Sequence, residues 1–263
     1  MMTRSTPMER SRMRSVVGLV TVVVLGLRTE RLDCGPPQVP KMSAFAPAGD
    51  LLQQVDFFVG RVEESLADPT DFDGAKQSRT RKDANTLAAL ALVLSLHDED
   101  YPTKASMPAL LRAAQSLAAA DDNVQQATLA LSAVRQARST TTPSTERAKW
   151  EKAASLPALM KQVPLVHSGL KRGVEPNRLR RQAAQSAGQA AALAAIAQAA
   201  MLDDQYTKNA QDVEQWVELC TKMRDAAGEV NSAVHAQDQA RVSSGMKRLA
   251  DSCESCHATF RHE

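Results

Sequence analysis

The chain has 263 residues, of which only 3% are aromatic, and its formal net charge is +2 at pH 7. Strand-rich folds depend on aromatic and β-branched residues, so an all-β sandwich or barrel is not expected. A hydrophobic fraction of 43% argues against a wholly disordered chain, and the small net charge gives no reason to expect a nucleic-acid partner.

Residues 1–46 are predicted to be a signal peptide or N-terminal anchor followed by a linker. Arg10, Arg12 and Arg14 precede an uncharged stretch at 15–27, which is short for a membrane span but suits the apolar region of a signal peptide. The stretch Ala44-Phe45-Ala46 has the small-x-small pattern of a cleavage site, although Pro47 follows it directly. Export, for example to the periplasm, is therefore expected; an uncleaved anchor or a misassigned start codon is the alternative.

Residues 47–142 are predicted to form four amphipathic helices, because apolar residues recur at steps of three and four. The expected helices cover 51–66, about 78–97, 107–117 behind an N-cap at Ser106, and 124–134 behind a cap at Asp121 or Asp122. The apolar faces comprise Leu52, Val55, Val59, Val62 and Leu66; Leu87, Leu90, Leu94 and Leu96; Met107, Leu110, Ala114 and Leu117; and Val124, Ala127, Leu131 and Val134. The polar run 139–144 indicates a linker.

Residues 148–263 are predicted to form four more helices with sustained apolar seams. The first of these helices ends at Gly173 and Pro176. A very Ala-rich helix, about 178–201, follows it, and the small side chains of this helix let a neighbour or a flat ligand approach closely. The seams comprise Leu156, Leu159, Val163, Val166 and Leu170; Val213, Trp216, Cys220, Met223, Ala227, Val230 and Val234; and Val242, Met246, Leu249, Cys253, Cys256 and Phe260.

The expected fold is therefore all-α, with an antiparallel four-helix bundle at the C-terminus and a second helical bundle before it. Short matches between the two halves favour an internal duplication. For example, 96–101 reads LHDEDY and 201–206 reads MLDDQY. The first half has no cysteine after residue 34, so it is predicted to be a haem-free helical domain.

The sequence Cys253-Glu254-Ser255-Cys256-His257 is a C-x-x-C-H motif, which is typical of covalent haem attachment. The two thiols form thioethers with the haem vinyl groups, and the histidine supplies a nitrogen to the iron. On a helix these three side chains share one face, which is the seam that also holds Leu249 and Phe260. A single haem c with His257 as metal ligand is expected, facing the bundle interior.

Three other interpretations of the motif are a zinc half-site, a redox dithiol and an exposed disulfide. A zinc site needs about four ligands, and Cys220, His235 and His262 lack tandem spacing with the motif. A thioredoxin-like dithiol is expected near a βαβ pattern, which this helical sequence lacks. Haem attachment is favoured over all three.

The end of the chain, from Cys253 to Arg261, resembles that of class II c-type cytochromes, the cytochrome c-prime family. The resemblance covers about residues 150–263. It implies a four-helix bundle with haem attached near the end of the last helix, Cys253 and Cys256 as the thioether residues and His257 as the proximal ligand.

The resemblance leaves the sixth iron ligand open. In the family, the first helix carries basic-Gln-x-x-Met or basic-Gln-x-x-Leu over the distal haem face, and Lys161-Gln162-x-x-Leu165 matches the second form. That match implies an open sixth position. Periodicity, however, places Leu165 opposite the seam and Met160 and His167 closer to it, unless Pro164 kinks the helix and resets its phase.

Three further residues have expected places near the motif. Cys220 falls within its helix seam and is expected to be a buried apolar residue. Trp216 is expected in the core, where it could line the haem pocket. Arg261 either pairs with a haem propionate or ends the helix in solvent.

The leading functional hypothesis is an exported electron carrier, not an enzyme, because a peroxidase would need a distal acid–base pair that the sequence does not reveal. Small-gas binding at an open iron position, and a helical interaction module with structural haem, are the alternatives. Redox proteins are the expected partners. Membrane contact is expected only through an uncleaved N-terminal segment, and a homodimer is left open.

Overall fold

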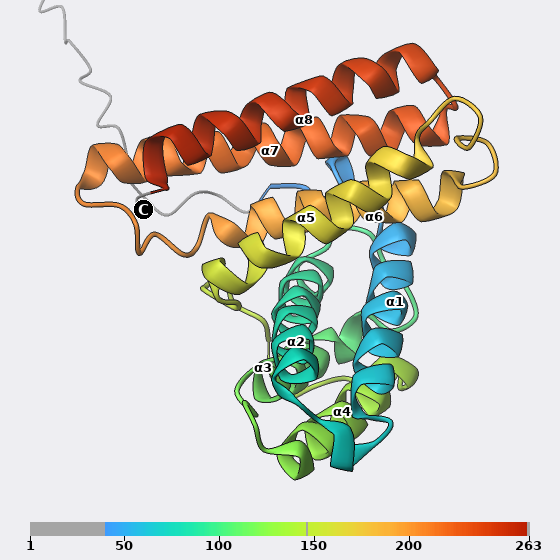
Figure 1. Ribbon diagram of the computed structural model, residues 1–263, viewed down its shortest axis with the longest axis vertical. Helices are drawn as coiled ribbons and strands as arrows, with labels where there is room; N and C mark the ends of the chain where they lie inside the picture. Colours follow the sequence, from blue (N-terminus) through green and yellow to red (C-terminus); the bar gives the residue numbers. More distant parts are fainter. Residues whose placement is uncertain (1–39, 146, 262–263) are drawn as a thin grey trace, which may run out of the picture. The chain divides into compact units, whose positions relative to one another are not determined.

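Helices are the regular elements of residues 40–145 and 147–261, the parts of the chain that the computed structural model describes (Figure 1). Eight α-helices lie in these ranges: α1 (Ala48–Leu66), α2 (Gly74–Ser95), α3 (Met107–Ala118), α4 (Val124–Ser139), α5 (Leu156–Gly173), α6 (Ala183–Ala200), α7 (Ala210–His235) and α8 (Gln239–Phe260). Three short 3₁₀ turns accompany them: η1 (Met42–Ala44), η2 (Pro69–Asp71) and η3 (Lys104–Ser106). The expected all-α class is confirmed for the described residues.

The starts of α2, α3 and α4 differ from those expected. Asp73 caps α2, because its carboxylate accepts a hydrogen bond from the Lys76 amide at 2.9 Å, so this helix begins before residue 78. Asn123, and neither Asp121 nor Asp122, caps α4. Ser106 precedes α3 but makes no cap bond; its hydroxyl lies 2.7 Å from the Ala137 carbonyl oxygen at the end of α4.

Helix α6 is shorter than expected at its N-terminal end. The prediction began this helix at 178, but residues 178–182 form turns in which the amides of Arg178 and Leu179 both donate to the Glu175 carbonyl. The helix proper starts at Ala183, and nearly every residue from Ser186 to Ala200 is buried. The Ala-rich sequence therefore forms a central helix with neighbours on all sides.

Consecutive helices pack against one another, α1 to α4 in one group and α5 to α8 in the other (Figure 1). The groups also touch, since α1 and α2 both pack on α6, and α2 packs on α5. One apolar cluster continues from Leu51 and Leu90 in the first group to Leu170, Leu193 and Val230 in the second. The expected boundary at 142–148 therefore divides two helix groups that share a core. Within the described residues, no helix is both long and apolar enough to cross a bilayer.

Polar side chains join the two groups through the shared core. Asp83 of α2 is fully buried and accepts hydrogen bonds from Arg61 of α1 at 3.0 Å and from Gln162 of α5 at 3.0 Å. Asp50 of α1 accepts from Asn231 of α7 at 2.6 Å. These bonds fix α5 and α7 against the first group.

Candidate haem site

A cavity of about 90 Å³, partly open to solvent, lies among the four helices of the C-terminal group. This volume is smaller than the roughly 300–1,000 Å³ that is typical of ligand pockets. The lining residues are Met160, Val163 and Pro164 of α5; Ala197 and Ala200 of α6; Trp216, Leu219, Cys220 and Met223 of α7; and Ser252, Cys253, Cys256 and His257 of α8. Apart from Ser252 and His257, the wall is made of apolar side chains and thiols.

The C-x-x-C-H residues lie on one face of α8, as their spacing predicts. Cys253 and Cys256 are half-buried, and His257 lines the cavity while much of the residue remains exposed. The helix continues for one more turn to Phe260, which is buried. The motif therefore forms part of the cavity wall, near the mouth.

Aromatic packing fixes the end of α8 against α7. The rings of Phe260 and Trp216 meet edge to face with their centroids 5.3 Å apart. The Trp216 indole N–H donates to the Ala200 carbonyl of α6 at 3.0 Å, so three helices are joined beside the motif. Trp216 is buried, and it also lines the cavity, as the sequence suggested.

Helix α5 is fixed at its first turn by a buried carboxylate. Asp203, which follows α6, accepts a hydrogen bond from the Leu156 amide at 3.0 Å and lies 2.9 Å from the Lys152 ammonium. This places the first half of α5, with Met160 and Val163, across the cavity from α8. Small residues of α6, Ala197 and Ala200, leave the space between them.

The three candidates for the distal side lie in different places. Met160 lines the cavity and packs on the same apolar cluster as Cys256. Leu165 is 42% exposed and lines another cavity, so its place does not support the distal position that the resemblance implies. His167 lines a third cavity near Met246, and burial, with Lys171 nearby, lowers its pKa. Helix α5 continues through Pro164, and Leu165 remains on its exposed side.

Burial holds the thiols of the cavity in their neutral form. It raises the pKa of Cys253, and it raises the pKa of Cys256 to about 11, with the neighbouring Cys253 adding to the effect. The pKa of Cys220 is also raised, because this residue is buried as expected. All three cysteines are free thiols. A redox dithiol depends on a depressed thiol pKa, so this environment argues against that interpretation.

The donor set suits a haem held through two thioethers. A thioether has no ionisable proton, so attachment removes the two groups whose charged form burial disfavours. The apolar walls suit a macrocycle, and His257 adjoins the second thiol. Within 40–145 and 147–261, no three His, Cys, Asp or Glu side chains gather as a metal cluster.

Some lining residues were not among the candidates from sequence. Leu219 and Ser252 lie beside seam positions rather than in them, so periodicity alone gave no signal for them. Arg261 follows the last turn of α8, is exposed, and donates its backbone N–H to the His257 carbonyl. The backbone of Arg261 is therefore one helical turn from His257, and its side chain is exposed to solvent.

Comparisons with known proteins identify no relative. No protein-family model matches the chain, and neither a curated protein nor a solved structure matches it.

Proposed function

We propose that the chain is an exported c-type cytochrome that carries one haem c and transfers electrons. In this proposal α5 to α8 form a four-helix haem bundle of the class II, cytochrome c-prime-like type, within 148–263. The observation that supports it best is the common cavity: Cys253, Cys256 and His257 line the same apolar space among four helices. Export rests on residues 1–46, of which 1–39 lie outside the described residues.

Each lining residue has a role in this proposal. Cys253 and Cys256 would hold the haem through thioethers, and His257 would supply the proximal nitrogen. When bound, the haem supplies a reversible one-electron change at its iron. The apolar side chains of α5, α6 and α7 exclude water, and this burial is one factor that sets the reduction potential. Redox proteins would be the partners, and the protein itself would not be an enzyme.

Met160 is the candidate for the sixth iron ligand. It is the thioether side chain of α5 on the cavity wall, whereas Leu165 and His167 line other cavities. A Met and His ligand pair raises the reduction potential of a haem and suits electron transfer. Gas binding was the alternative suggested by Leu165, and the position of that residue no longer supports it.

The first helix group has a structural role in this proposal. Helices α1 and α2 cover α6, and α2 also packs on α5. The haem-free domain 47–142 would then support two of the four helices that form the haem cavity. This retains part of the interaction-module hypothesis, with the partner being the second half of the same chain.

Covalent haem is tested by expressing the full chain in a host that matures c-type cytochromes. We expect a mass increase of one haem and a c-type visible spectrum that survives denaturation. Cys253→Ala and Cys256→Ala should each weaken or abolish covalent attachment. Cys220→Ala is the matched control, because this cysteine lines the same cavity but lies outside the motif. A matured wild-type protein without covalent haem would contradict the proposal.

The distal side is tested by comparing Met160→Ala, Leu165→Ala and His167→Ala in the haem-loaded protein. Only Met160→Ala should convert a low-spin spectrum to a high-spin one that responds to carbon monoxide. If the wild-type protein is already high-spin and binds carbon monoxide, Met160 is not a ligand and gas binding becomes the better function.

A further inference from the structure

A second cavity of about 250 Å³, open in part to solvent, lies among α1, α5 and the start of α6. It is separate from the cysteine-lined cavity: the two have no lining residue in common. Its wall includes Gln54 and Phe57 of α1, Leu165 and Arg172 of α5, Arg178 of the following loop and Gln189 of α6. Amides, guanidinium groups and apolar side chains thus meet around one space.

Buried amide groups form the inner wall of this second cavity. Gln54 is only 3% exposed, and its side-chain oxygen has no hydrogen-bond partner among the described residues. The Gln189 side-chain oxygen is buried and unpartnered in the same way. Because an unpaired buried acceptor is unfavourable, a ligand that brings hydrogen-bond donors would be stabilised here.

Two glycines make room for these amides. A Cβ atom at position 188 would lie 2.7 Å from the Gln54 side-chain nitrogen, and one at position 169 would overlap the Gln189 amide. Glycine at 169 and 188 therefore allows both glutamines to lie close against neighbouring helices. The polar wall depends on close packing, which distinguishes it from a chance gathering of surface side chains.

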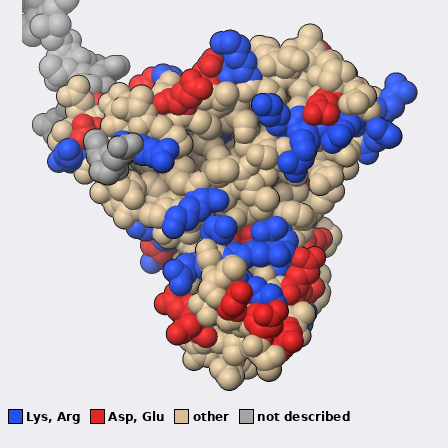
Figure 2. Space-filling model, in the orientation of Figure 1, with Lys and Arg blue, Asp and Glu red and all other residues tan. Residues whose placement is uncertain are grey.

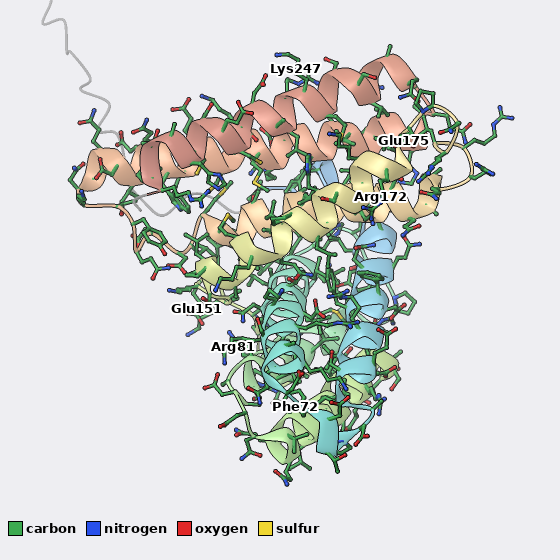
Figure 3. All side chains as sticks on the ribbon, in the orientation of Figure 1. Phe72, Arg81, Glu151, Arg172, Glu175 and Lys247 are labelled. Atoms are coloured by element: carbon green, nitrogen blue, oxygen red, sulfur yellow. The ribbon has the colours of Figure 1, made fainter. Side chains whose placement is uncertain are left out.

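Positive charge surrounds the mouth of the second cavity. The segment 171–181 carries Lys171, Arg172, Arg178, Arg180 and Arg181, against the single acid Glu175. Figure 2 shows blue side chains gathered at the right-hand end with little red among them, and Figure 3 labels Arg172 and Glu175 in this region. The Arg178 Nε atom lies 3.3 Å from a carboxylate oxygen of Glu175. Arg172, in contrast, has no ion-pair partner among the described residues. The N-terminal end of α6 adds partial positive charge.

Two exposed apolar side chains complete the wall. Phe57 is 43% exposed and Leu165 is 42% exposed, and they come from different helices. A ligand that fits this wall needs an apolar body for these side chains and an anion for the guanidinium groups. It also needs a donor for the buried oxygens.

We propose that the second cavity binds a small organic carboxylate that has an apolar body and a hydrogen-bond donor. The planar fork of Arg172 matches a carboxylate, and positive potential at the mouth attracts an anion. Phe57 and Leu165 contact the apolar body, and the Gln54 oxygen accepts from the donor. The proposal does not depend on haem.

The test uses the full mature chain and isothermal titration with 4-hydroxybenzoate at low salt. We expect binding with a dissociation constant of about 1 mM or tighter. Benzoate lacks the donor and phenol lacks the carboxylate, so both should bind at least about threefold more weakly. No binding of 4-hydroxybenzoate at about 10 mM, or equal binding of phenol, would overturn the proposal. Inorganic phosphate as tight as the probe would also overturn it, by indicating an unspecific anion site.

The site is located with variants of two nearby arginines, Arg172 in the last turn of α5 and Arg180 in the loop that follows it. Arg172→Gln should weaken 4-hydroxybenzoate binding about tenfold, because it removes the unpaired guanidinium of the cavity wall. Arg180→Gln makes the same change of charge at an exposed position outside the wall and should weaken binding less than about twofold. Equal weakening by the two variants would mean that the segment 171–181 attracts anions only through its net charge, and it would overturn the proposal. Circular dichroism establishes that both variants are folded.

Discussion

Asp83 shows how one side chain connects three helices. Its carboxylate is 0% exposed and lies 3.0 Å from the Arg61 guanidinium and 3.0 Å from the Gln162 amide nitrogen. Burial raises the pKa of Asp83, and the charge of Arg61 opposes that rise. A buried charge remains tolerable only while its partners satisfy it, so the cost of breaking this group exceeds that of a surface pair.

Replacing Asp83 should therefore destabilise the protein strongly. Asp83→Ala is expected to lower the free energy of unfolding by about 3 kcal/mol, because it leaves the largely buried Arg61 without its partner. Asp71→Ala is the control: Asp71 pairs with Lys76 at 2.6 Å but is exposed, so less than about 1 kcal/mol should be lost. Urea unfolding of both variants measures the difference, and equal losses would contradict this account.

The thiols of the motif make a second prediction at the residue scale. With a pKa of about 11 for Cys256, against a reference of 9.0, its thiolate fraction near pH 8 falls about 100-fold. In protein produced without haem, alkylation of Cys256 should therefore be slow near pH 8 and accelerate toward pH 11. Urea-unfolded chain serves as the control and should react rapidly. Fast alkylation of the folded chain near pH 8 would contradict the burial of this thiol.

The raised pKa of Cys256 also makes the stability of the folded protein depend on pH. A thiol whose pKa is raised by folding binds its proton more tightly in the folded state than in the unfolded state. The haem-free protein should therefore lose stability as the pH rises from about 9 to about 11, where the unfolded chain ionises first. Thioether formation removes the ionisable proton, so the haem-loaded protein should lack the part of this loss that is due to Cys253 and Cys256.

At the scale of elements, two features place the residues of the cavities: the position of each residue around its helix, and the distance between neighbouring helices. Helix α5 turns Met160 toward one cavity and Leu165 toward another, five residues further along the same helix. Helices α7 and α8 approach so closely that a Cβ at Gly245 would lie 2.8 Å from the Val230 side chain. The absence of a side chain at this position brings α8, and with it the motif, against α7.

Two glycine substitutions separate helix propensity from close packing. Gly60→Ala in α1 should stabilise the protein by about 0.5–1 kcal/mol, because alanine favours the helix and a Cβ there meets nothing within 4 Å. Gly245→Ala has the same propensity gain but overlaps Val230, and should destabilise by about 1–2 kcal/mol. Thermal unfolding of the two variants gives the comparison. Stabilisation by both would mean that α7 and α8 are not in close contact.

At the scale of the whole molecule, the two helix groups depend on one core. Helix α6 is buried along almost its whole length, with α1 and α2 covering it on the side away from α7. Small alanine side chains bury little area each, so α6 depends on close neighbours to be stable. The cysteine-lined cavity uses the same helix, which links the first half of the chain to the candidate site.

The fragment 148–263 should therefore fail to fold by itself. Without α1 and α2, the apolar faces of α5 and α6 would be exposed to water, and such surfaces aggregate. We expect the fragment to be insoluble or to lack cooperative unfolding, and to attach little haem in a maturing host. Co-expression of 40–145 should restore part of both properties. A soluble, haem-loaded fragment with cooperative unfolding would instead establish two independent domains.

The sequence by itself determined the helices and the shared face of the motif, because both depend on local spacing of 3.6 residues per turn. Cys253, Cys256 and His257 could be placed on one side of a helix without any knowledge of its neighbours. Tertiary structure decided that α1 and α2 complete the core of the second group and that Met160, rather than Leu165, meets the cysteine-lined cavity. These outcomes depend on packing between helices that are distant in the chain. A periodic pattern predicts which face of a helix is buried, but it does not predict which other helix packs on that face.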